Sequence, residues 1–129
     1  MIVEALLAIA LEKECLAKNI YHEARGESVD GQLAVAEVTL NRVLDPKFPN
    51  TVCEVVWDSG QFSWTAKEPK IKNNESWKQV SQLVEEIATN QTELLEIGAV
   101  FYHEKSIQPY WSESFTRVGR IGSHVFYAW

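Results

Sequence analysis

Apolar residues recur at helical spacing near the start of the chain, and a glycine follows the last of them. The positions that share one face of this predicted helix are Leu7, Ala10, Ala17, Ile20, Tyr21 and Ala24. A spacing of three to four residues is typical of an amphipathic helix. Because glycine commonly follows the last turn of a helix, we expect this one to end at Gly26.

A second apolar stripe follows after a short corner. Its members are Leu33, Ala36, Leu40, Val43 and Leu44. Ser28 is suited to cap the start of this second helix. Asp45-Pro46 ends it, because the residue before a proline avoids helical backbone angles. The two helices therefore form a hairpin, with residues 23–27 near its corner.

The pattern then predicts shorter elements and one more long helix. A helical turn follows Pro49-Asn50-Thr51 and buries three valines at positions 52, 55 and 56. Residues 58–64 are polar, aromatic and glycine-containing, which suits the wall of a cleft, and residues 67–73 are a charged, exposed connection. Asn74 or Ser76 then caps a helix. Its apolar positions are Trp77, Val80, Val84, Ile87 and Ala88.

The period of the pattern changes toward the C-terminus. Residues 97–103 alternate in the manner of a strand. Thr116–Ile121 and His124–Tyr127 flank Gly122-Ser123, a pair suited to a type II′ hairpin turn. The whole pattern predicts a mainly helical α+β fold with a small antiparallel β element near the C-terminus.

Size and charge narrow the possible functions. With 129 residues the chain fits one domain, residues 1–129. Its net charge is −6 and its basic residues are scattered, which argues against a nucleic-acid partner and against stable association with anionic membranes. The apolar run of residues 1–11 lacks a basic region and a small-residue cleavage site, and is too short to span a bilayer. We therefore expect no signal peptide.

The two cysteines, Cys15 and Cys53, have neither the spacing of a Cys-x-x-Cys motif nor the density of a disulfide scaffold. Buried free thiols are the expectation. A single bridge between them would require that the fold bring them together.

Candidate chemistry is concentrated at the corner between the first two helices, in the run Ile20-Tyr21-His22-Glu23-Ala24-Arg25-Gly26-Glu27. Apolar residues one and two turns before Glu23 place its carboxyl half in the core and half in a cleft. Desolvation raises the pKa of such a carboxyl, which makes Glu23 a candidate general acid. Glu27 would be an ionised helper, with Arg25 holding it ionised. The alternative is that both carboxylates are solvated surface charges around Arg25.

A series of motifs in a fixed order resembles a known family. The motifs are Leu16-Ala17, Tyr21-His22-Glu23-Ala24-Arg25-Gly26-Glu27, Gly31-Gln32, Ala34-Val35-Ala36, Asn41-Arg42-Val43, Phe48-Pro49, Gly60-Gln61-Phe62, Ala99-Val100-Phe101-Tyr102-His103, Pro109-Tyr110-Trp111 and Ile121-Gly122-Ser123-His124-Val125-Phe126-Tyr127. On these motifs the chain resembles the SleB/CwlJ-type cell wall hydrolases. That family includes spore cortex-lytic enzymes and phage-encoded lysins, and it is related to lysozyme-like lytic transglycosylases.

The resemblance implies a lysozyme-like helical domain that cleaves peptidoglycan glycan strands between N-acetylmuramic acid and N-acetylglucosamine. Its catalytic Glu is the first in Glu-Ala-Arg-Gly-Glu, which here is Glu23. In a lytic transglycosylase one Glu protonates the bridging oxygen and then accepts the proton of the attacking muramic 6-hydroxyl. Such an enzyme needs no aspartate nucleophile, and we expect no cofactor and no metal.

Polar and aromatic residues elsewhere are candidates for binding the saccharide. They are Gln61, Ser63, Trp64, Tyr102, His103, Tyr110 and His124. Aromatic faces and hydrogen-bonding side chains together suit a sugar-binding wall. The alternative for each is ordinary packing, which is favoured for Phe62 and Phe101, and slightly for His124.

Two other functions remain open at this point. His22, His103, His124 and Glu23 could be zinc ligands of an amidase or peptidase that acts on the stem peptide, although no local His-Glu-x-x-His motif is present. The domain could instead bind glycan without cleaving it, because a fold does not by itself establish an activity.

The cellular setting is the most distant inference. A catalytic unit without an export signal resembles a phage endolysin, which is stored in the host cytoplasm and released by a holin-like partner. It would then act at the cell wall or in the periplasm. We expect a monomer.

Overall fold

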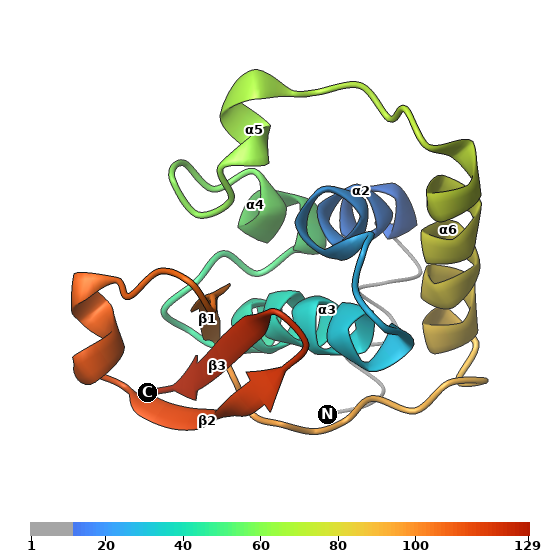
Figure 1. Ribbon diagram of the computed structural model, residues 1–129. Coiled ribbons are helices and arrows are strands. Elements are labelled where there is room, and N and C mark those ends of the chain that lie inside the picture. The colour runs from blue at the N-terminus through green and yellow to red at the C-terminus, as the bar shows by residue number, and fades with distance from the viewer. Residues whose placement is uncertain (1–11) are drawn as a thin grey trace.

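The computed structural model describes residues 12–129. Within this range the chain forms five α-helices, one 3₁₀ helix and a three-stranded sheet (Figure 1). The α-helices are α2 (Lys13–Ala24), α3 (Val29–Leu44), α4 (Val52–Val56), α5 (Trp64–Lys67) and α6 (Asn74–Ala88). The remaining elements are β1 (Phe101–Glu104), η1 (Tyr110–Glu113), β2 (Thr116–Ile121) and β3 (His124–Ala128). The predicted mainly helical α+β class is confirmed.

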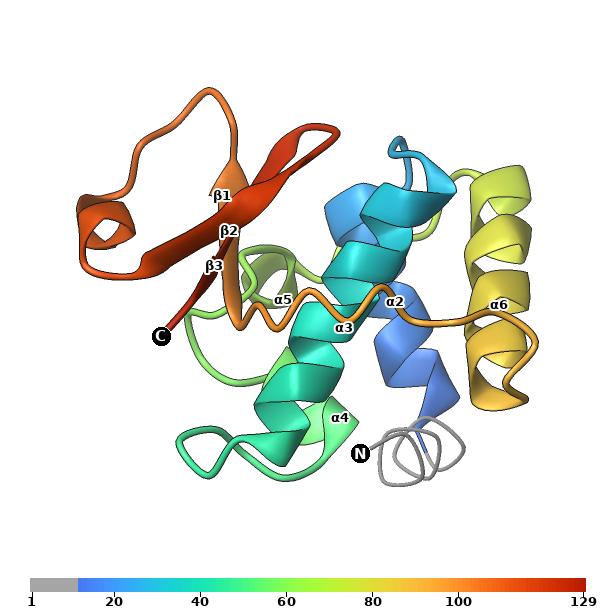
Figure 2. The same ribbon diagram turned by 90° about the horizontal axis from the view of Figure 1, so that it is seen from below.

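The helix α3 lies between the sheet on one side and α2 and α6 on the other (Figure 2). The helical side of the core gathers apolar residues from α2, α3, α4 and α6, with Phe62 and Trp64 from the segment between α4 and α5. A smaller apolar cluster joins α3 to the sheet through Val35, Val38 and Phe126. This arrangement places the corner between α2 and α3 against the hairpin of β2 and β3.

Side-chain caps fix the starts of three helices. Ser28 Oγ accepts a hydrogen bond from the backbone N–H of Gly31 (3.2 Å), and Thr51 Oγ1 accepts one from Glu54 (3.2 Å). The predicted cap of α6 was misplaced by one residue or more, because Asn73 Oδ1 accepts the hydrogen bond from the backbone of Ser76 (3.0 Å). The predicted part of the first helix that contains Leu7 and Ala10 lies outside the described residues.

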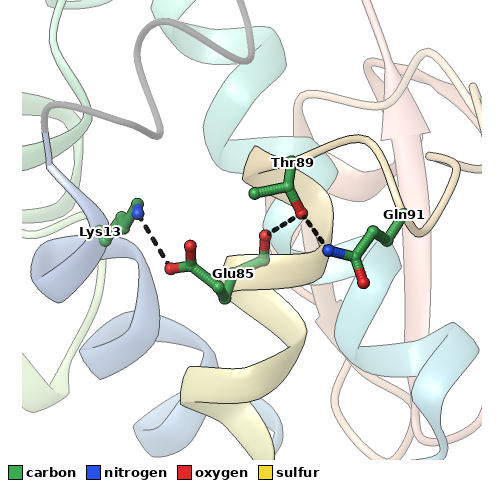
Figure 3. Close-up of polar contacts among 4 residues, drawn as sticks. All are labelled: Lys13, Glu85, Thr89 and Gln91. Atoms are coloured by element: carbon green, nitrogen blue, oxygen red, sulfur yellow. Dashed lines mark hydrogen bonds and ion pairs between the residues drawn. The ribbon is translucent and has the colours of Figure 1, made fainter.

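Polar contacts close the other end of α6 (Figure 3). The Thr89 hydroxyl donates to the carbonyl of Glu85, and the Gln91 side chain donates to Thr89 Oγ1, both at 2.9 Å. The Glu85 carboxylate forms an ion pair with Lys13 at 2.9 Å, which joins α6 to the start of α2. Because this pair is solvent-exposed, it orients the helices more than it stabilises them.

The first helix ends just before Gly26, close to the predicted position, but the glycine does not adopt a positive φ. Helix α2 ends at Ala24, Arg25 still has right-handed helical angles, and Gly26 is not among the residues with positive φ. The side-chain amide of Gln32 lies 3.4 Å from each of the carbonyl oxygens of residues 24, 25 and 27. The backbone N–H of Glu27 also donates to the carbonyl of Ala24 (2.9 Å), so a turn through Gly26 closes the helix end and the Gln32 amide adds a donor from α3.

The sheet has the strand order β1-β3-β2, and both pairs are antiparallel. Gly122 has φ +57° and Ser123 has no positive φ, as a type II′ turn requires. The strand predicted for residues 97–103 is shorter than expected and begins at Phe101. Ahead of it, the Glu37 carboxylate accepts hydrogen bonds from the backbones of Leu95 (2.9 Å) and Ile97 (2.8 Å), so this segment follows α3 and not the sheet.

The expectation of free thiols was wrong, because Cys15 and Cys53 form a disulfide that joins α2 to α4. Their Cα atoms are 5.2 Å apart, within the range that a bridge requires. The packing of α4 across the first turns of α2 decides this, and a spacing of 38 residues gives no sign of it. None of the helices in residues 12–129 is sufficiently long and apolar to span a membrane.

Candidate active site

Glu23 occupies the last turn of α2, and its side chain is partly buried. Leu16 and Ile20, one and two turns before it, are completely buried, as the sequence predicted. The Tyr102 hydroxyl, from β1, donates a hydrogen bond to Glu23 Oε1. A carboxyl from a helix end and a phenol from a sheet therefore meet at the boundary between the two parts of the fold.

Burial raises the pKa of the Glu23 carboxyl, while the hydrogen bond from Tyr102 and the charge of Arg42 oppose that rise. The net shift is upward, so the protonated acid is favoured more than in an ordinary glutamate. Burial together with the neighbouring carboxylate raises the pKa of Tyr102 well above its ordinary value. Tyr102 therefore keeps its proton and remains a hydrogen-bond donor to Glu23.

The guanidinium of Arg42 is buried close to this pair. Its Nε donates to the carbonyl of Val100 (2.8 Å), and one terminal nitrogen donates to Gln61 Oε1 (3.4 Å). The rings of Phe48, Phe62 and Phe101 lie 5.0, 5.2 and 5.7 Å from its central carbon. Such a guanidinium is a fixed positive charge beside Glu23.

Contrary to expectation, the fold does not bring Arg25 into contact with Glu27. Glu27 Oε1 accepts a hydrogen bond from the backbone N–H of Ser123 in the hairpin turn (2.8 Å). Arg25 instead lies with its guanidinium 4.9 Å from the centre of the Tyr21 ring. Glu27 thus ties the corner of α2 and α3 to the hairpin, and the structure provides no contact by which Arg25 would keep it ionised.

The three candidates within residues 61–64, at and just before the start of α5, have different surroundings. Gln61 is exposed and its side-chain oxygen contacts Arg42, which brings it to the neighbourhood of Glu23. Ser63 is exposed. Trp64 is only 8% exposed, and its indole N–H donates to Asn19 Oδ1 (2.8 Å), so it is largely a packing residue.

The candidates from the C-terminal part of the chain also differ in their surroundings. Both ring nitrogens of His103 have partners within the protein, the hydroxyl of Tyr127 (2.9 Å) and the carbonyl of Glu104 (2.8 Å). Tyr110 is 95% exposed at the start of η1. His124 is buried, its ring lies edge-on to Tyr102 with 5.0 Å between ring centres, and its Nδ1 has no hydrogen-bond partner. Of these three, only His124 adjoins the pair of Glu23 and Tyr102.

The residues considered as zinc ligands do not converge. His22 stacks on Trp64 with 4.5 Å between ring centres, while the other candidates contact tyrosine hydroxyls or the Tyr102 ring. Among residues 12–129, no group of three or more His, Cys, Asp or Glu side chains is placed to hold a metal ion.

The model of the cell wall hydrolase family matches residues 26–127. The chain belongs to this family. Curated relatives include the spore cortex-lytic enzyme of Bacillus subtilis, which is 31% identical over 86% of this chain and 35% of that protein. The spore cortex-lytic enzyme of Bacillus cereus is 30% identical over 88% of this chain and 42% of that protein. The chain thus spans less than half the length of these relatives.

Solved structures agree with this assignment to the cell wall hydrolases. The catalytic domain of the germination-specific lytic transglycosylase SleB from Bacillus anthracis has a TM-score of 0.71 and 32% identity, and the match covers 88% of this chain and 90% of that one. The catalytic domain of the Bacillus cereus SleB protein has a TM-score of 0.70 and 31% identity, with coverage of 87% and 85%. The resemblance inferred from the sequence motifs is therefore confirmed.

Arg42 is the residue of this cell wall hydrolase site that sequence reasoning missed. It was recognised only as part of the motif Asn41-Arg42-Val43, without a role. It lies outside the apolar stripe predicted for its helix, yet it is only 4% exposed. A charged residue within a family motif was the available signal, but two of its three aromatic neighbours, Phe62 and Phe101, come from distant parts of the chain.

Proposed function

We propose that this cell wall hydrolase domain is a lytic transglycosylase that cleaves peptidoglycan between N-acetylmuramic acid and N-acetylglucosamine, with Glu23 as its acid and base. The observation that carries the proposal is the partly buried Glu23 carboxyl with a raised pKa and a tyrosine hydroxyl on one oxygen. The structural neighbour from Bacillus anthracis is a germination-specific lytic transglycosylase, which supports the reaction type.

The arrangement orients the reactive proton. Because the hydroxyl of Tyr102 occupies Glu23 Oε1, the proton of the neutral acid is carried on Oε2, which is left for the substrate. Glu23 donates this proton to the bridging oxygen as the bond from that oxygen to C1 of the muramyl unit breaks. The muramyl 6-hydroxyl oxygen then bonds to C1, and its proton returns to Glu23. The products are a 1,6-anhydromuramyl end and a free 4-hydroxyl, and no water is consumed.

Arg42 has a supporting electrostatic role in this scheme. Its fixed charge stabilises the Glu23 carboxylate that exists between the two proton transfers. Burial favours the neutral form instead. The opposing influences keep both protonation states of one carboxyl accessible, which an acid that must also act as a base requires.

Mass spectrometry of soluble fragments tests the reaction. Purified peptidoglycan is digested in parallel with the wild type and with Glu23→Gln, and 1,6-anhydromuramic ends are expected from the wild type alone. Reducing muramic ends would replace the proposal with a lysozyme-type hydrolase. Free stem peptides would indicate an amidase, and binding without any fragments would indicate a glycan-binding domain.

We propose, further, that the protein serves as a phage endolysin that accumulates in the host cytoplasm, is released by a holin-like partner and acts as a monomer on the wall. The support is the resemblance to a family that includes phage-encoded lysins. A disulfide also fits action in an oxidising compartment outside the cytoplasm. Expression with and without a holin should show lysis only in its presence, and light scattering after gel filtration should give a mass near 14.7 kDa.

A further inference from the structure

A surface groove lies against the last turns of α2, where His22 directly precedes Glu23. Lys18 and His22, one turn apart on α2, line one side. Trp57 at the end of α4, Trp64 at the start of α5 and residues 68–71 line the other. The groove has a volume of about 280 Å³. Neither the proposed proton transfers nor the contacts of Tyr102 use it.

Three aromatic rings in mutual contact form one wall of this groove. The rings of His22 and Trp64 are 4.5 Å apart at an angle of 31°, and Trp57 meets Trp64 edge-on at 5.2 Å. The hydrogen bond from the Trp64 indole to Asn19 fixes this wall. Trp57, in contrast, is 40% exposed. An exposed indole held against a rigid wall offers a flat apolar face, which suits the C–H face of a sugar ring.

The rim carries two lysines, Lys18 and Lys70, and one carboxylate, Glu68, on a chain whose net charge is −6. Lys18 pairs with Glu14 at 3.1 Å, while the ammonium group of Lys70 has no ion-pair partner within residues 12–129. Burial lowers the pKa of His22, so the imidazole is neutral near pH 7 and adds no charge. An exposed lysine beside an aromatic wall favours a ligand with both a ring and a carboxylate.

Two further observations connect the groove with the reaction site. Trp57 and Trp64 bracket the segment that contains Phe62, whose ring packs 6.5 Å from that of Tyr102. The groove and the catalytic carboxyl are therefore separated by a single loop. Glu68 at the rim has φ +43°, a left-handed conformation that costs energy for a residue other than glycine and that often occurs at functional sites.

We propose that this groove is an outlying subsite for a muramyl unit of the glycan strand. The sugar ring lies against the Trp57 indole, and a carboxylate of the same unit, from its lactyl group or its stem peptide, faces Lys70. The inference depends on the proposed function for the identity of the polymer, but not on its cleavage. A glycan strand that occupies both this groove and the reaction site at Glu23 is bound on two sides of the segment between α4 and α5.

The test is a direct binding measurement in a Glu23→Gln background, where no cleavage is expected. The probes are a hexasaccharide of alternating N-acetylglucosamine and N-acetylmuramic acid, the same hexasaccharide with stem peptides, and a hexamer of N-acetylglucosamine. Calorimetric titration should show that Trp57→Ala weakens binding of all three about tenfold, and that Trp57→Phe retains most of the affinity. Trp129→Ala is the matched control, because that indole is 47% exposed but packs on Phe48 and Phe101.

Lys70→Gln tests the charge and its source. Weaker binding of the peptide-free muramyl probe, with unchanged binding of the uncharged hexamer, assigns the carboxylate to the lactyl group. An effect only on the peptide-bearing probe assigns it to the stem peptide. Equal binding of all probes by the wild type and Lys70→Gln overturns the carboxylate contact.

Affinity in folded Trp57→Ala equal to that of Trp129→Ala overturns the subsite altogether. The binding test of the groove and the product test of the proposed reaction can fail independently of one another. Anhydromuramic products from a protein whose binding does not depend on Trp57 would refute the groove alone. Trp57-dependent binding by a wild type that yields no fragments would refute the reaction alone.

Discussion

Substitution of Gly122 by alanine probes the contact that fixes the hairpin against the corner of α2 and α3. Gly122 has φ +57°, and a Cβ built there lies 2.2 Å from Glu27 Oε1. The left-handed conformation costs an alanine about 1–2 kcal/mol. The carboxylate must also move, which breaks its hydrogen bond with Ser123, and a hydrogen bond to a charged group contributes about 1.5–3 kcal/mol. These ranges add to about 2.5–5 kcal/mol, and we expect a loss near the middle of that range, roughly 3–4 kcal/mol, in the free energy of unfolding.

Substitutions at two other glycines distinguish the cost of the backbone conformation from the cost of displacing the Glu27 carboxylate. Gly60 also has a positive φ (+78°), but nothing lies within 4 Å of an added Cβ, so Gly60→Ala should cost only about 1–2 kcal/mol. Gly119 has open space and no positive φ, and Gly119→Ala should change little. Urea denaturation followed by circular dichroism gives the three values on one scale.

The reasoning fails if Gly122→Ala costs no more than Gly60→Ala. A second comparison uses Glu27→Ala, which removes the carboxylate. In that background Gly122→Ala should cost only the backbone term, about 1–2 kcal/mol. A cost that stays at roughly 3–4 kcal/mol would show that something other than Glu27 resists the added methyl group.

Three other outcomes are expected. Activity should fall at alkaline pH as Glu23 loses its proton. Because the hydrogen bond from Tyr102 holds the pKa of Glu23 down, Tyr102→Phe should shift this alkaline limb of the pH–rate profile to higher pH. An alkaline limb at the same or lower pH would contradict this role of Tyr102. Because burial raises the pKa of Glu23 in the folded state, ionised Glu23 lowers the stability of the fold at pH values above the ordinary carboxyl pKa. The melting temperature of Glu23→Gln should therefore be a few degrees above that of the wild type at pH 8 and equal to it at pH 4. A lower melting temperature of the variant at pH 8 would be inconsistent with burial. Replacing both cysteines by alanine should lower stability by about 4 kcal/mol in the chain-entropy description of a 38-residue loop, measured by urea denaturation; no loss would mean that the bridge does not constrain the unfolded chain.

Local sequence determined the elements and their ends to a large extent. The cap at Ser28, the short helix after Thr51, the end of α3 before Pro46 and the turn at Gly122-Ser123 each depend on neighbours within a few residues, and all occur as predicted. The exceptions are positions where a distant group supplements or replaces the local signal. Gln32 adds a side-chain donor to the turn after α2, and Glu37 draws residues 95–97 away from the sheet.

The position of Glu23 was likewise predictable, because its burial follows from the apolar residues of its own helix. Its partners were not. Tyr102 and Arg42 belong to a strand and to another helix, and the sequence pattern alone suggested a sugar-binding role for the first and none for the second.

The sequence by itself therefore determined the family, the fold class and the candidate acid, since ordered motifs and helical periodicity are local properties of the chain. The tertiary structure decided the Cys15–Cys53 bridge, the use of Glu27 as a tie to the hairpin, and the tyrosine and arginine that set the pKa of Glu23. These depend on distances between residues far apart in the chain, which packing of α3 between α2 and the sheet sets and which spacing along the sequence does not encode.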